Sequence, residues 1–219
     1  MKTKGLLVAI LSLFLFVGPV QAAPILDFNM DGGHPAGASI SYAGGVNPLV
    51  GVNISVDSVL GIGTPVNDGV AVPMVGILTF TTGNYSGGGA SQWTFAGGGS
   101  ISVDIPNIQQ NVLSGTFTNA RVEIEGDLGF RVVIGGFDDV KWEDITDFYG
   151  LPGGPYKGSI NLSFLTTILP PNAFTSSNVL SGDIKNTPGK VPEPISLILL
   201  GSGLAGAGLV RRLRKPKKG

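Results

Sequence analysis

The chain of 219 residues contains no cysteine and a single histidine, His34. Disulfide scaffolds and thiol nucleophiles are therefore excluded, as are zinc sites built from the usual three or four Cys and His ligands. Charged residues are also scarce, at 13%. His34 precedes Pro35 in a glycine-rich segment, and no G-x-S-x-G sequence is present, so the pattern favours an exposed loop histidine over a catalytic base.

Glycine and proline are abundant instead, with 35 and 15 residues. This content disfavours long helices, whereas a hydrophobic fraction of 42% is too high for a disordered chain. Glycine does not recur at every third position, which excludes collagen. The composition predicts a packed, glycine-rich β domain.

Apolar residues in the central part of the chain recur at every second position, as expected for half-buried strands. The clearest runs are Leu26-Phe28-Met30, Ile101-Val103-Ile105, Val122-Ile124, Phe130-Val132-Ile134 and Ile160-Leu162-Phe164. Turn signals separate them, including Asp31-Gly32-Gly33, Gly87-Gly88-Gly89, Gly97-Gly98-Gly99 and Gly135-Gly136. We expect an all-β antiparallel sandwich, jelly-roll-like or Ig-like, of about ten short strands over residues 23–169.

Two segments depart from this pattern. Ile145, Phe148 and Tyr149 follow helical spacing, so 141–151 is expected to form one or two helical turns. Residues 170–190, with Pro170-Pro171 and Pro188-Gly189, are expected to be a linker.

The N-terminus has the pattern of a secretory signal peptide. Lys2 and Lys4 precede an apolar run from Leu6 to Val17, and small residues follow up to Ala22. We expect signal peptidase to remove residues 1–22 by cutting between Ala22 and Ala23, so that the protein is exported across the inner membrane.

The C-terminus, residues 191–219, holds a second hydrophobic segment, Ile195–Val210, without a charge. Val191-Pro192-Glu193-Pro194 precedes it, and a basic tail at 211–218 follows, with Arg211, Arg212, Arg214 and Lys215. Sixteen helical residues span roughly 24 Å, so the segment can cross a bilayer only marginally. The positive-inside rule places the tail in the cytoplasm and residues 23–190 on the far side of the membrane.

This order of Pro-Glu-Pro, hydrophobic helix and arginine-rich terminus resembles the PEP-CTERM sorting signal of Gram-negative bacteria. The resemblance implies recognition at Pro192, Glu193 and Pro194 by exosortase, an integral-membrane protease-transpeptidase found in species that make exopolysaccharide, and removal of the helix and tail. The protein would be anchored transiently and then reside in the envelope or outside the cell. The alternative is a permanent C-terminal anchor with a polybasic end.

The part between the two ends is acidic. Residues 23–190 hold six Lys and Arg residues and fourteen Asp and Glu residues, a net charge of −8. This charge disfavours binding to nucleic acid and to anionic lipid.

A calcium site is suggested by Asp27-x-Asn29-x-Asp31-Gly32, which matches the first half of a calcium-binding loop. Ala38 stands where the bidentate Glu belongs, and alternation along a strand explains the same residues as its solvent-facing side. A second and weaker calcium candidate is the group of acidic residues Asp138, Asp139, Asp144 and Asp147. We expect no cofactor and keep calcium as the alternative.

The expected function is that of a non-enzymatic envelope or extracellular-matrix protein, associated with exopolysaccharide or biofilm. One alternative is a carbohydrate-binding or calcium-dependent adhesion module, because sugar rings stack on exposed aromatic residues. The candidates for stacking are Trp93, Trp142, Tyr85, Tyr149 and Tyr156, although Trp93 and Phe95 have strand spacing typical of a core. A glycan hydrolase built on two of the many carboxylates is a weaker alternative.

Overall fold

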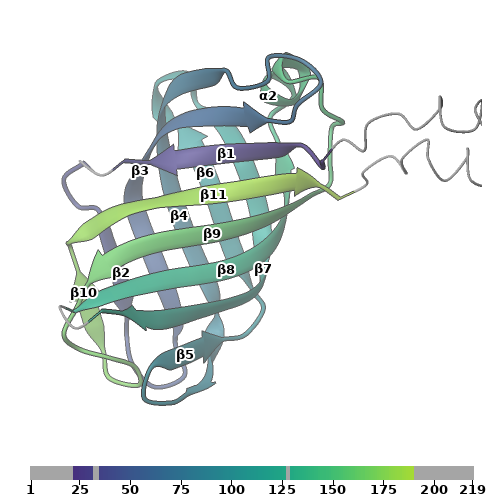
Figure 1. Cartoon of the computed structure of the whole chain (residues 1–219). Coiled ribbons are helices and arrows are strands. Elements are labelled where there is room, and N and C mark those ends of the chain that lie inside the picture. The colour runs from purple at the N-terminus through teal and green to yellow at the C-terminus, as the bar shows by residue number, and fades with distance from the viewer. Residues whose placement is uncertain (1–21, 32–34, 127–128, 190–219) are drawn as a thin grey trace, which may run out of the picture. The chain divides into compact units, whose positions relative to one another are not determined.

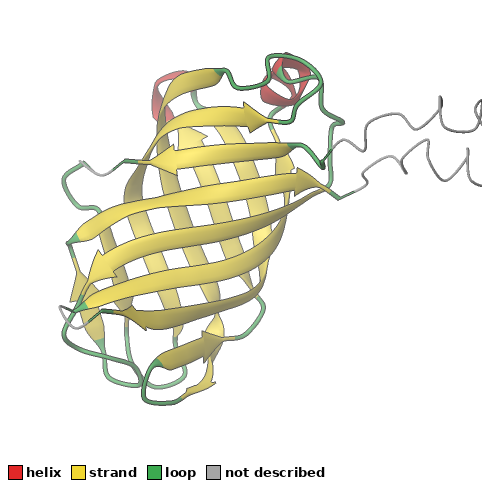
Figure 2. Ribbon diagram, viewed as in Figure 1, coloured by secondary structure: helices red, strands yellow, loops and turns green. Residues whose placement is uncertain are grey.

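The computed structural model describes residues 22–31, 35–126 and 129–189. The described part is nearly all β, with antiparallel strands in one sheet and very little helix (Figures 1 and 2). Ala23–Lys190 form a compact unit. The prediction of an all-β antiparallel domain is therefore confirmed.

Eleven strands make up the sheet of the described domain. They are β1 (Ile25–Met30), β2 (Ser39–Tyr42), β3 (Pro48–Ile62), β4 (Ala71–Gly88), β5 (Gln92–Phe95), β6 (Gly98–Ile105), β7 (Gln110–Glu125), β8 (Phe130–Lys141), β9 (Tyr156–Leu165), β10 (Phe174–Ser176) and β11 (Val179–Pro188). A 3-10 turn, η1 (Pro106–Ile108), precedes β7. The short helix α2 (Glu143–Phe148) follows β8, which confirms the helical turns expected at 141–151.

The sheet closes on itself. Each strand in the order β3, β1, β11, β9, β8, β7, β6 and β4 pairs with the next, and β4 pairs again with β3. The shorter strands extend this ring: β2 pairs with β3, β10 pairs with β2, and β5 lies between β4 and β7. Figure 1 shows β1, β11, β9 and β8 side by side on one wall, with β4 and β6 behind them.

The expected sandwich of short strands is wrong in two respects. A sandwich has two separate sheets, whereas here β3 pairs with both β1 and β4, so no break divides the sheet into two layers. The strands are also longer than expected, with 15 residues in β3 and 18 in β4. Register shifts in the β3–β4 ladder add local bends and twist, which let long strands curve into a closed sheet.

Some glycines that look like turn signals lie inside strands. Gly135 and Gly136 fall within β8. A Cβ at Gly135 would lie 2.8 Å from the ring of Phe117, so this glycine gives the ring room to pack. That ring contacts Phe80 and Phe137 at centroid distances of 6.0 and 5.9 Å. Neither glycine marks a change of chain direction, and Gly135 serves packing across the sheet.

Residues 170–190 were expected to be a linker, and this is also wrong. They contain β10 and β11, and β11 lies between β1 and β9 within the ring. The sheet closes because β11 pairs with both β1 and β9. These partners are distant in the sequence, so the residues of 170–190 alone do not reveal the pairing. The described part of the folded domain thus extends to Gly189, beyond the expected boundary at 169.

The alternation of apolar residues identifies the side of each strand that faces the enclosed core. Leu26, Phe28 and Met30 of β1 are all fully buried, as are Ile160, Leu162 and Phe164 of β9. No helix among the described residues is long and apolar enough to cross a membrane. The helix expected at 195–210 and the signal peptide up to Gln21 lie outside the described residues.

Candidate functional site: a buried Lys, Asp and Asn cluster

Three polar side chains meet inside the closed sheet. Asp139 and Lys141 belong to the last three residues of β8, and Asn186 lies near the end of β11. Strand alternation turns Phe137, Asp139 and Lys141 to the same, inner face. The side chains of Lys141 and Asp139 are 0% exposed, and Asn186 is 0% exposed as a whole residue. Charged side chains are almost never buried so completely without a partner.

The contacts join all three residues through the Lys141 ammonium group. Lys141 Nζ forms an ion pair with Asp139 Oδ2 and donates a hydrogen bond to Asn186 Oδ1 at 2.9 Å. Aromatic rings enclose the same nitrogen: the Tyr156 centroid lies 4.8 Å from Nζ and the Phe28 centroid 5.8 Å away. The cluster is thus built from β8, β9, β11 and β1, four consecutive strands of the ring.

Burial dominates the electrostatics of this cluster. It lowers the pKa of Lys141 to about 6, because the charged ammonium loses its hydration. Burial also raises the pKa of Tyr156 to about 12, and the Tyr156 hydroxyl donates to the carbonyl of Pro152 at 2.5 Å. The Lys141 amine therefore loses its proton at a much lower pH than the amine of an exposed lysine does.

Some polar atoms of the cluster are left without hydrogen bonds. Within the described part of the chain, Asn186 Nδ2 has no hydrogen-bond partner, and neither Asp139 oxygen accepts a hydrogen bond. The ion pair with Lys141 compensates for Asp139 only in part. Buried polar atoms without partners cost free energy, so their presence calls for an explanation.

Gly158 makes the cluster possible. It lies on β9 between Phe137 of β8 and Asn186 of β11 in the strand register. A Cβ at this position would lie 2.1 Å from the Phe137 ring and 2.7 Å from Asn186 Oδ1. The missing side chain leaves the space above β9 that these two residues occupy.

Sequence reasoning did not find this cluster. The sequence places Asp139 near Asp138, Asp144 and Asp147, but the structure separates Asp139 from them. Asp138 is exposed and pairs with Lys157 at 2.5 Å, whereas Asp139 faces the core. The available signal was the alternation Phe137-x-Asp139-x-Lys141, which places both charges on the face of an apolar residue.

The calcium candidates lie along β1 and directly after it. Asn29 alternates with the buried Leu26, Phe28 and Met30, as the strand interpretation predicts, whereas Asp27 is itself buried and so does not lie on a solvent-facing side. Asn29 Nδ2 donates to Ser58 Oγ at 3.5 Å, and the backbone N–H of the exposed Asp31 donates to Asp57 Oδ2 at 2.9 Å. Among the residues described, no group of three or more His, Cys, Asp or Glu side chains could hold a metal ion. Calcium binding at Asp27, Asn29 and Asp31 stays a prediction.

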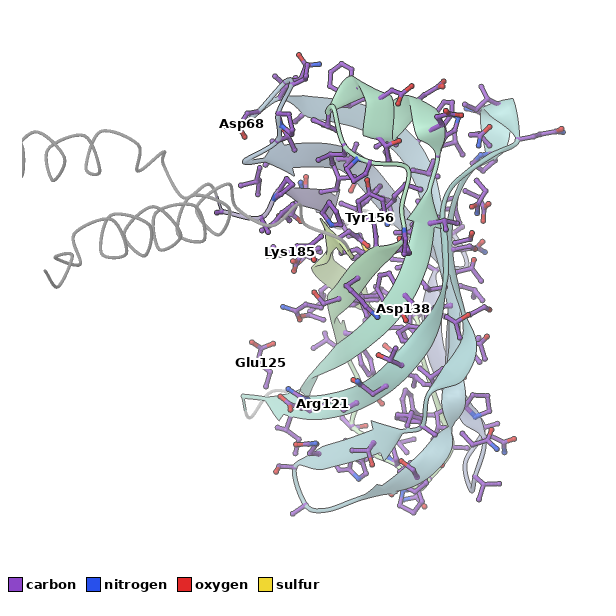
Figure 3. All side chains as sticks on the ribbon, turned by 90° about the vertical axis from the view of Figure 1, so that its right-hand side faces the viewer. Asp68, Arg121, Glu125, Asp138, Tyr156 and Lys185 are labelled. Carbon is purple, nitrogen blue, oxygen red and sulfur yellow. The ribbon has the colours of Figure 1, made fainter. Side chains whose placement is uncertain are left out.

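Asp27 is buried, and its carboxylate lies beside the ammonium group of Lys185 on β11. Lys185 Nζ lies 4.0 Å from Asp27 Oδ2 and 2.7 Å from Asp183 Oδ2. Burial raises the pKa of Asp27; the positive charge of Lys185 opposes this rise, and the negative charge of Asp183 adds to it. The Asp183 hydrogen bond in turn raises the pKa of Lys185. Figure 3 labels Lys185 and also shows Glu125 extending away from the sheet.

Most of the aromatic residues considered for sugar stacking serve the core. Tyr149 and Tyr156 are fully buried, and Trp93 is 4% exposed. Tyr85 and Trp142 are partly buried and pack against the same core. The core assignment of Trp93 and Phe95 is thereby confirmed.

Of the two predicted processing sites, the structure describes only the signal-peptide cleavage site. Ala22 and Ala23 are exposed and precede β1, so a cut between them leaves the sheet intact. His34, the sorting residues Pro192, Glu193 and Pro194, and the tail residues Arg211, Arg212, Arg214 and Lys215 lie outside the described residues.

Comparison with known proteins identifies the C-terminal segment. A family model of the PEP-CTERM protein-sorting motif matches residues 190–215, which include both the Pro-Glu-Pro sequence and the start of the basic tail. No curated protein and no solved structure matches the chain. The chain therefore carries a PEP-CTERM protein-sorting motif, which identifies it as an exported protein that exosortase sorts to the cell envelope.

Proposed function

We propose that the domain 23–190 is a non-enzymatic structural protein of the envelope or extracellular matrix, associated with exopolysaccharide and delivered by exosortase. The observation that carries this proposal is the position of the sorting motif. The last strand, β11, ends at Pro188, and the motif match begins at 190. Removal of the C-terminal segment at or after its Pro-Glu-Pro sequence would thus release a domain that keeps all its strands.

The interior of the domain supports a structural role. Apolar side chains from every wall of the closed sheet pack into one cluster, including Phe28, Phe80, Phe117 and Phe164. The buried polar cluster belongs to this packed interior, since the side chains of Lys141 and Asp139 are 0% exposed. A soluble substrate has no access to groups that are fully enclosed in this way.

Transport and processing are tested with the full chain in a host that has exosortase and makes exopolysaccharide. We expect a mature form that begins at Ala23, lacks the hydrophobic segment and tail, and is found outside the inner membrane. Replacement of Pro192, Glu193 and Pro194 by alanine should leave the protein in the inner membrane with its tail attached. Mass spectrometry of each cell fraction measures both results. A wild-type mature form that still ends at Gly219 would contradict the proposal.

Association with the matrix is tested separately, in an otherwise identical host that makes no exopolysaccharide. We expect the mature protein to co-sediment with the matrix of the first host and to appear in the medium of the second. An equal distribution in the two hosts would argue against matrix association. Release of reducing ends from the purified exopolysaccharide by the mature protein would instead indicate a hydrolase.

A further inference from the structure

The buried cluster contains the groups needed for a bond between two side chains. We propose that Lys141 and Asn186 become joined by an intramolecular isopeptide bond, which the folded chain forms itself with Asp139 as the acid–base group. The amine and the amide are already in contact, since Lys141 Nζ lies 2.9 Å from Asn186 Oδ1. Such a contact places Nζ near the amide carbon, where a nucleophile must approach.

The first requirement is a neutral amine, because a protonated ammonium has no free electron pair. Both the lysine and its counter-ion are fully enclosed, with side-chain exposures of 0%. Transfer of the ammonium proton to Asp139 removes both charges from this environment, where charges are costly. The lowered pKa of Lys141 agrees with this direction of transfer.

The second requirement is a group that shuttles protons. The electron pair of Lys141 Nζ attacks Asn186 Cγ, and the carbonyl π electrons move to Oδ1. The Asp139 carboxylic acid, by then protonated, donates its proton to Nδ2, and the C–N bond breaks as the carbonyl re-forms. The Asp139 carboxylate then takes one of the two protons of the attacking nitrogen and becomes the carboxylic acid again, and Nζ keeps its other proton in the new amide. The products are a secondary amide and one molecule of ammonia, so atoms and electrons balance without an oxidant or reductant.

The environment of the cluster favours this reaction over competing ones. The Tyr156 and Phe28 rings surround the amine, and full burial keeps bulk water from the amide carbon. The atom that leaves, Asn186 Nδ2, has no hydrogen-bond partner among the described residues. Its departure therefore removes a buried polar group that folding alone does not satisfy.

The bond would connect two strands that are not neighbours. Lys141 ends β8 and Asn186 lies on β11, with β9 between them in the sheet. The link would hold β11, the strand that leads into the sorting segment, in the closed sheet. In a chain without cysteine, such a bond does what a disulfide does in other exported domains: it restricts the unfolded chain.

The intact mass of the mature exported protein tests this proposal. We expect a mass about 17 Da below the value calculated from its ends, which corresponds to the loss of one ammonia. Tandem mass spectrometry should find a branched peptide that contains both Lys141 and Asn186. A wild-type mass equal to the calculated value would overturn the proposal, whether or not any variant folds.

Variants distinguish ammonia loss through the proposed bond from ammonia loss at another asparagine or glutamine. Lys141→Arg, Asn186→Ala and Asp139→Ala should each restore the calculated mass. Asp138→Ala is the matched control: this neighbouring carboxylate is exposed and pairs with Lys157, so the variant should keep the loss of about 17 Da. A loss that persists in Lys141→Arg would overturn the proposal, because it would come from another asparagine or glutamine. Circular dichroism of each exported variant shows whether it has folded.

Discussion

Lys141 and Lys157 show how position decides the chemistry of a side chain. Each pairs with an aspartate of β8, and the two aspartates are consecutive in the sequence. The pair of Lys157 and Asp138 faces solvent, where an ion pair contributes little to stability. The pair of Lys141 and Asp139 is enclosed, where removal of one partner leaves an uncompensated buried group.

The variant Asp139→Ala should reveal this burial as a pH dependence. It leaves Lys141 without a counter-charge, and burial lowers the pKa of this lysine from 10.5 to about 6. Between these values the unfolded chain binds a proton that the folded chain does not bind. The free energy of unfolding should therefore rise with pH, by roughly 1 kcal/mol per pH unit between pH 7 and 9. Urea unfolding at several pH values measures the slope.

Asp138→Ala serves as the control for this pH series. It removes an exposed carboxylate one residue away and leaves Asp139 in place, which takes up the proton of the enclosed lysine, so folding changes the number of bound protons less. The slope between pH 7 and 9 should be clearly smaller in this variant than in Asp139→Ala. A slope near zero in Asp139→Ala as well would show that Lys141 does not lose its proton on folding.

At the scale of the element, glycines decide which strands can lie close together. Gly158 of β9 gives room to the Phe137 ring and to Asn186 Oδ1. Gly51 of β3 does the same for Phe80, whose ring would lie 2.1 Å from an added Cβ. These positions belong to extended strands, so they need glycine for the space above the sheet and not for an unusual backbone angle.

Gly158→Ala should destabilise the domain, because the added methyl group collides with an aromatic ring in a packed core. We expect a loss of about 1–3 kcal/mol in the free energy of unfolding. Gly153→Ala is the matched control, because a Cβ there meets no atom within 4 Å. Thermal unfolding of both variants gives the comparison. A Gly158→Ala protein as stable as the Gly153→Ala protein would mean that the packing over β9 can relax.

On the scale of the whole domain, stability depends on closing the ring. β1 and β11 come from opposite ends of the folded chain and pair along five residues, from Leu26 with Asn186 to Met30 with Gly182. Without β11, both β1 and β9 would expose the backbone groups that they now use for pairing. Unpaired strand edges favour aggregation.

Truncation tests this dependence directly. A chain of residues 23–169 lacks β10 and β11, and we expect it to lose cooperative thermal unfolding and to aggregate. A chain of residues 23–189 keeps every described strand and should unfold in one transition. Circular dichroism during heating distinguishes the two. A cooperative transition in the shorter chain would show that 170–189 is dispensable, as a linker would be.

Periodicity and terminal motifs were sufficient for part of this description. The alternation in β1 and β9 identified their buried faces, because successive side chains of a strand point to opposite sides. The order of Pro-Glu-Pro, apolar segment and basic tail identified the sorting signal, because targeting segments are recognised as short linear sequences. Both properties are local and need no knowledge of what lies nearby in space.

Closure of the sheet, the place of β11 and the polar cluster were decided only by the tertiary structure. Strand pairing joins residues as far apart as Leu26 and Asn186, and alternation does not specify which partners pair. Lys141 and Asn186 come together because β8, β9 and β11 are neighbours in a fixed register, and Gly158 leaves space between them. The sequence by itself determined where the protein goes and which faces are buried; the fold decided which buried groups meet, because only long-range packing brings them into contact.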